Sequence, residues 1–91
     1  MATTYGNVSV AATATLIVAA NSNRKGVIIT NESTTAKLYI GPDSSITTSN
    51  AVSLEASGKF TDAGQQDNFK GDIYGIVASS TNDVRYWEWT P

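Results

Sequence analysis

A chain of 91 residues with a net charge of −2 has room for one domain and a small hydrophobic core. It contains no cysteine and no histidine, which excludes disulfides, cysteine-based zinc sites and the most common general base of enzymes. The six basic residues are scattered along the chain, so we expect no nucleic-acid partner. We therefore predict a single non-enzymatic domain, residues 1–91, that needs no cofactor and gains stability by association with other chains.

Short runs of β-branched and aromatic residues, bounded by turn residues, follow one another along the whole chain. They lie at residues 5–10, 13–19, 27–30, 37–40, 46–48, 51–54, 59–61, 73–78 and 83–89. We expect the last two runs to form a hairpin and residues 1–5 to form a flexible N-terminal arm. The pattern predicts an all-β fold of about eight short strands, a single antiparallel β-sandwich that is jelly-roll-like or barrel-like.

The most apolar run, residues 16–20, is much shorter than the roughly 20 residues that cross a bilayer. The first residues also lack the basic and apolar segments of a signal peptide. We therefore expect no membrane partner.

The last predicted strand alternates between two kinds of side chain. If Val84 faces the core, Glu88 shares its face, while Arg85, Trp87 and Trp89 form a ladder on the outer face. A buried Glu88 needs a partner such as Lys37 or Lys59, or a place near the strand end that reaches water.

Trp87 and Trp89 are compatible with three roles: a cap on the domain's own core, a contact with another protein subunit, or a stacking platform for a sugar. Tryptophan and arginine are enriched at the centres of interfaces. Arg24 and Lys25 lie in a polar segment and are compatible with a solvated turn or with a contact to an acidic patch. The interface residues that we predict are Tyr5, Arg24, Lys25, Tyr74, Arg85, Trp87 and Trp89.

Carboxylates are the remaining candidates for chemistry. Asp62, Asp67 and Asp72 are close in sequence, but they fall in or beside predicted loops and not on the rigid elements that glycosidase chemistry requires. Asp43, in the turn Gly-Pro-Asp, and the pair Asp67 and Asp72 lack the ligand spacing of a calcium loop. We interpret these side chains as turn-forming, with no catalytic or metal site.

Three stretches resemble a recurrent pattern in small virion proteins of tailed bacteriophages. They are VSVAATATLIVAANSNRKGVIITN at residues 8–31, LYIGPD at 38–43 with the Ser/Thr-rich segment 46–50, and GDIYGIVA at 71–78 with DVRYWEW at 83–89. The resemblance implies a compact β-sandwich without catalytic residues, of the head decoration or cement type.

On that resemblance we predict a protein made in the host cytoplasm and located on the capsid surface of the virion. Its partners would be copies of itself, as a homotrimer, and the major capsid protein. Two alternatives remain open: an adaptor or receptor-binding module of the tail, neck or fibre, and a carbohydrate-binding domain that uses Trp87 and Trp89.

Overall fold

The computed structural model describes residues 2–63 and 68–90, and it contains eight strands and no helix in that part of the chain. In chain order the strands are β1 (Ala2–Val10), β2 (Thr15–Val18), β3 (Gly26–Asn31), β4 (Leu38–Gly41), β5 (Val52–Leu54), β6 (Lys59–Ala63), β7 (Ile73–Ile76) and β8 (Asn82–Thr90). The predicted all-β fold is confirmed. No helix long and apolar enough to span a bilayer occurs in the described residues.

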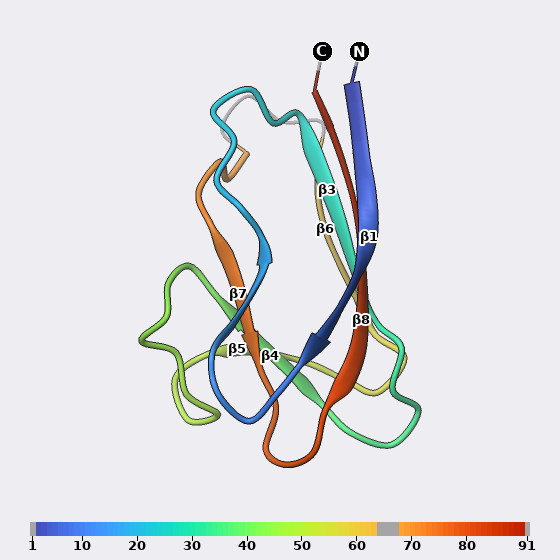
Figure 1. Cartoon of the computed structure of the whole chain (residues 1–91), viewed down its shortest axis with the longest axis vertical. Coiled ribbons are helices and arrows are strands. Elements are labelled where there is room, and N and C mark those ends of the chain that lie inside the picture. The colour runs from blue at the N-terminus through green and yellow to red at the C-terminus, as the bar shows by residue number, and fades with distance from the viewer. Residues whose placement is uncertain (1, 64–67, 91) are drawn as a thin grey trace.

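The strands form two four-stranded antiparallel sheets, ordered β1-β8-β3-β6 and β2-β7-β4-β5. Figure 1 shows the two sheets face to face, with the chain passing repeatedly from one to the other. Among the described strands, β4 and β5 are the one consecutive pair that lies in the same sheet. This order is that of a jelly roll, so the sandwich expectation is confirmed in its jelly-roll form.

The predicted hairpin of residues 73–78 and 83–89 is wrong. β7 pairs with β2 and β4, whereas β8 pairs with β1 and β3 in the other sheet. The link between them crosses the sandwich and does not turn back within one sheet. The physical reason is that two strands joined by a short link can bury their apolar residues side by side in one sheet or opposite each other in two sheets. Their alternation is the same in both cases.

The core lies between the two sheets and consists almost entirely of β-branched side chains and leucine. Val27 and Ile29 of β3 face it from one sheet, and Leu38 and Ile40 of β4 face it from the other, each pair two residues apart. The predicted strand at residues 37–40 is thereby confirmed. The buried cluster comprises Val10, Ile17, Val18, Val27, Ile29, Leu38, Ile40, Ile73, Val77 and Val84.

Residues 46–48, predicted as a strand, lie in the irregular link between β4 and β5. Ile46 is buried, and its side chain occupies the space beside Gly41 where any larger residue would place its Cβ. Gly41 is two residues from Tyr39 and four from Lys37, on the outer side of β4, so Ile46 covers part of that outer face. Ile46, which we predicted in a strand, instead fixes the loop between β4 and β5 by burying its side chain.

The N-terminal residues also differ from the expectation. Residues 2–5, predicted as part of a flexible arm, lie in β1 and pair with Trp87–Thr90 at the end of β8. Residue 1 lies outside the described residues. Tyr5 is therefore held in a sheet, opposite Trp87, and is not carried on an arm.

One end of the sandwich is closed by two buried asparagines. Asn82 donates from Nδ2 to Oδ1 of Asn31 at 3.1 Å. Asn31 in turn donates to the carbonyl oxygens of Ala36 at 2.9 Å and Glu55 at 3.1 Å. These bonds join the start of β8 to the loops that follow β3 and β5, so a polar network fixes three segments at this end.

Candidate interaction surface

The alternation predicted for the last strand is confirmed by β8. Val84 is fully buried and Glu88 is 7% exposed, so both face inward. Arg85 and Trp87 are exposed and Trp89 is partly exposed on the opposite side. The indoles therefore lie on the outer surface of the β1-β8-β3-β6 sheet and not in the core between the sheets.

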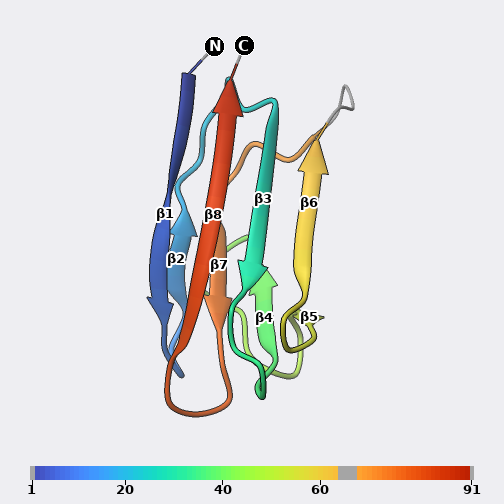
Figure 2. The same cartoon turned by 90° about the vertical axis from the view of Figure 1, so that its right-hand side faces the viewer.

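Strand pairing places further apolar side chains beside these indoles. Trp87 lies opposite Tyr5 of β1 on one side and Ile28 of β3 on the other. Trp89 lies opposite Thr3 and Gly26 in the neighbouring row. We call the surface formed by Thr3, Tyr5, Ile28, Trp87 and Trp89 the aromatic face. Figure 2 looks onto this sheet, with the second sheet behind it.

The two indoles of the aromatic face differ in how the protein supports them. Gly26 has no side chain, and the ring of Trp89 fills the space where a Cβ would stand. Trp87 lies opposite Ile28 and not opposite a glycine, and it remains 52% exposed. Tyr5 beside it is 80% exposed. Large exposed aromatic rings that are adjacent on one surface are typical of a contact with another molecule.

The rings of Trp87 and Trp89 pack edge to face. Their centroids are 5.9 Å apart and their planes meet at 62°. Together with Thr3 and Ile28 they line a shallow hollow of about 250 Å³. The aromatic face is therefore apolar and uneven, a shape that suits contact with an irregular protein surface.

The same sheet becomes polar next to the aromatic face. Arg85 lies 3.8 Å from a carboxylate oxygen of Glu32 and 3.3 Å from one of Asp83. Asn7 of β1 donates to Asp83 at 3.4 Å. One cation lies beside two carboxylates here, and all three side chains are at least 37% exposed. They therefore form a solvated polar rim and not a strong field of one sign.

The other predicted interface residues do not join this surface. Tyr74 lies in β7 of the second sheet, opposite Leu16 of β2, and is partly buried. Lys25 is exposed at the end of the sandwich where β3 begins. Arg24 is fully buried, so its assignment to a solvated turn or an interface is wrong.

Arg24 is a structural residue that joins three parts of the chain. Its Nε donates to Glu88 Oε2 at 2.5 Å, its Nη1 to the carbonyl oxygens of Phe69 and Gly71 at 3.0 Å each, and its Nη2 to that of Ala19 at 2.8 Å. A guanidinium can satisfy several acceptors at once because its donors point in fixed directions. This contact also gives the inward Glu88 its counter-charge, in place of Lys37 or Lys59.

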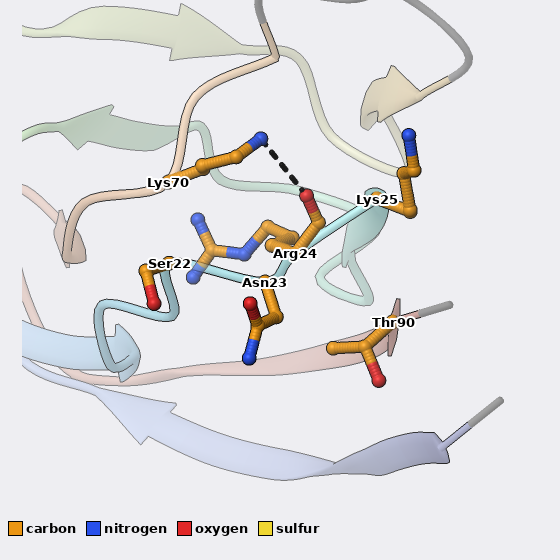
Figure 3. A pocket seen from close by; sticks show the side chains of 6 residues that line it. All are labelled: Ser22, Asn23, Arg24, Lys25, Lys70 and Thr90. Atoms are coloured by element: carbon orange, nitrogen blue, oxygen red, sulfur yellow. Dashed lines mark hydrogen bonds between the residues drawn. The ribbon is translucent and has the colours of Figure 1, made fainter.

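A polar hollow of about 400 Å³ lies beside this contact and is lined by Ser22, Asn23, Arg24, Lys25, Lys70 and Thr90. Figure 3 shows that Lys70 reaches over the segment that carries Arg24. Lys70 Nζ donates to the Arg24 carbonyl oxygen at 3.1 Å and to Asn68 Oδ1 at 2.9 Å. The charged groups of Arg24 and Lys70 are therefore bonded within the fold.

The candidate carboxylates shape loops. Asp43 accepts from the Ser45 amide at 2.9 Å. Asp62, expected in or beside a loop, lies in strand β6 and accepts from the Phe69 amide at 2.8 Å. Asp72 accepts from the Ala20 amide at 2.7 Å. Asp67 lies outside the described residues. In residues 2–63 and 68–90, no group of three potential metal ligands comes together.

An apolar hollow that the sequence did not predict lies beside β4, β5 and β6. It has a volume of about 200 Å³ and is lined by Ile40, Gly41, Pro42, Val52, Phe60, Phe69 and Ile73. Val52 is 66% exposed and Phe69 41% exposed. The lining residues come from four separate segments of the chain, so no local sequence pattern could predict the hollow.

Comparisons of the chain with protein-family models, curated proteins and solved structures gave no match. The resemblance to phage virion proteins therefore stays a prediction.

Proposed function

We propose that the chain is a non-enzymatic structural protein of a tailed-phage virion, a head decoration or cement protein that binds the outer capsid surface as a homo-oligomer. The observation that carries the proposal is the aromatic face, with Trp87 and Tyr5 exposed side by side on an uncovered sheet. The resemblance of three sequence stretches to small virion proteins is the reason for proposing a tailed-phage virion as the particle that the chain binds.

The aromatic face has the composition expected of a binding surface. Its centre carries Trp87, Tyr5 and Ile28, and its border carries Arg85, Asp83 and Asn7. An apolar, aromatic centre with a polar rim is the usual anatomy of a protein interface. Jelly rolls occur in viral capsid proteins, which supports the proposal by analogy of fold, and also in lectins, which supports the carbohydrate-binding alternative in the same way.

A stiff platform makes such a surface effective. The buried contacts of Arg24 fix one end of the sandwich, and the Asn31–Asn82 pair fixes the other. Little conformational freedom is then lost when the sheet binds, so more of the contact free energy appears as affinity. Several copies in one oligomer multiply weak contacts by avidity, which would resist expansion of a filled head.

The relief of the aromatic face favours a protein surface over a glycan. Rings that meet at 62° cannot both lie parallel to one flat sugar chain, as a stacking platform requires. The carbohydrate-binding alternative therefore has less support from the geometry than a capsid contact.

The test is co-sedimentation of the purified chain with heads of the encoding phage that lack it. We expect Trp87→Ala to weaken binding at least about 30-fold, as for a hot-spot residue. The matched control is Leu16→Ala, which removes an apolar side chain that is 42% exposed on the other sheet and should change binding less than about twofold. Equal binding of both variants would contradict the proposal.

The copy number in purified virions separates the head from the tail. A decoration protein is present in hundreds of copies, whereas a tail, neck or fibre adaptor is present in a handful. A tryptophan fluorescence shift with oligosaccharides, and none with heads, would favour the carbohydrate-binding alternative.

A further inference from the structure

Exposed edge strands tend to pair with other chains, and natural proteins protect them with short length, bulges or charges. Three of the four edges in the described sandwich have such protection. β2 has four residues and a register shift between Leu16 and Val18, and β5 has three residues. β6 has five residues and carries Lys59 and Asp62.

β1 is the exception. It is nine residues long and contains no charged residue and no proline. Within the described residues it pairs with β8 on one side, and no strand pairs with its other side. Figure 2 shows β1 at the border of its sheet, parallel to the long axis of the molecule. It therefore offers a long row of backbone donors and acceptors to a further strand.

We propose that β1 pairs antiparallel with β1 of a second copy of this chain, so that two sheets become one of eight strands. A second copy fits this edge because the strand is uncharged and meets no electrostatic repulsion from itself. The contact is isologous, since the same residues contribute from both copies, and it closes with two chains. A dimer then takes the place of the homotrimer predicted from the resemblance.

The strand pairs along its full length when the two-fold axis passes through Gly6, its middle residue. Thr3 then lies opposite Ser9 of the second copy, and Tyr5 lies opposite Asn7 of the second copy. Pairing in this register keeps odd-numbered residues on one side of the joint sheet. Both aromatic faces thus lie on the same side and form one continuous surface. This inference rests on the proposed function in one respect, the expectation that the chain forms a homo-oligomer.

Single cysteines test the register, because the natural chain has none. Thr3 and Ser9 are exposed, so Thr3→Cys and Ser9→Cys should leave the fold intact. Opposed residues of antiparallel strands are about 4.5–5.5 Å apart between Cα atoms, within reach of a disulfide. Two copies of Thr3, in contrast, would be about 20 Å apart. We expect a disulfide-linked dimer in an oxidised mixture of both variants and none with either variant alone.

Light scattering tests the association itself. The native chain should have a mass of about 19 kDa, twice the 9.6 kDa of one chain. Thr3→Lys with Ser9→Lys places like charges opposite each other and should give monomers. The matched control, Ser44→Lys with Ser53→Lys, adds the same charge at exposed positions away from β1 and should remain dimeric.

Three results would overturn the inference: a monomer at high concentration, a dimer that the β1 lysines leave intact, or cross-linking by one cysteine variant alone. The capsid proposal fails by a different result. Trp87→Ala should keep the dimer mass and lose binding to heads, so a monomeric chain that still binds heads through Trp87 would refute only the β1 contact.

Discussion

Replacing Arg24 with methionine removes a buried cation while keeping much of the side-chain volume. The change leaves Glu88, whose side chain is 10% exposed, without its counter-charge, and it removes the donors to three backbone carbonyls. Breaking a buried ion pair from one side costs about 3–5 kcal/mol. A domain of this size has a total stability of about 5–15 kcal/mol. We therefore expect Arg24→Met to lose a large part of the free energy of unfolding.

The measurement is urea denaturation followed by tryptophan fluorescence and circular dichroism. Arg85→Met is the matched control, because the Arg85 side chain is 61% exposed and its ion pairs span 3.3 and 3.8 Å. It should cost less than about 1 kcal/mol. Adding Glu88→Gln to Arg24→Met neutralises the uncompensated carboxylate and should restore part of the loss. A cost below about 1 kcal/mol for Arg24→Met, or a double variant less stable than Arg24→Met, would show that the Arg24–Glu88 pair does not stabilise the fold in this way.

Three further changes address other parts of the fold. Asn82→Ala removes a donor to a buried amide oxygen and should cost about 1–3 kcal/mol in urea denaturation; an unchanged midpoint would contradict the closing role of this network. Gly75→Ala places a Cβ 2.7 Å from Ile17 Cδ1 and should cost about 1–3 kcal/mol by overpacking, seen as a lower melting temperature; a stabilised variant would show that the core has spare room. Ile46→Ala should accelerate amide exchange in the β4–β5 loop but not in the core strands, and uniform exchange would contradict its role as a loop anchor.

Local alternation predicted the side-chain directions of β8 correctly. Val84 and Glu88 face inward and Trp87 faces outward because successive residues of a strand must point to opposite faces. The same rule could not predict which strands are neighbours. β7 and β8 are consecutive and both place apolar side chains in the core, yet they lie in different sheets. Each strand would show the same alternation if the two were paired in one sheet.

The role of Arg24 shows the limit of local patterns. It stands beside an exposed lysine in a polar segment, and its carboxylate partner is 64 residues away. One signal was present: the inward parity of Glu88 indicated either a cationic partner or a place near the strand end that reaches water. The predicted partners were lysines, whereas a guanidinium can also bind the carbonyls of the surrounding loops. Lys37 instead lies 3.8 Å from Glu55 at the surface.

Electron microscopy of heads decorated with this chain tests most directly the claim that the aromatic face is the binding surface. We expect the outer side of the β1-β8-β3-β6 sheet, with Trp87 and Tyr5, to contact the capsid. The β2-β7-β4-β5 sheet and its β4–β5 loop should then face the solvent. A bound protein with its two indoles directed to solvent, or with the second sheet against the capsid, would contradict it.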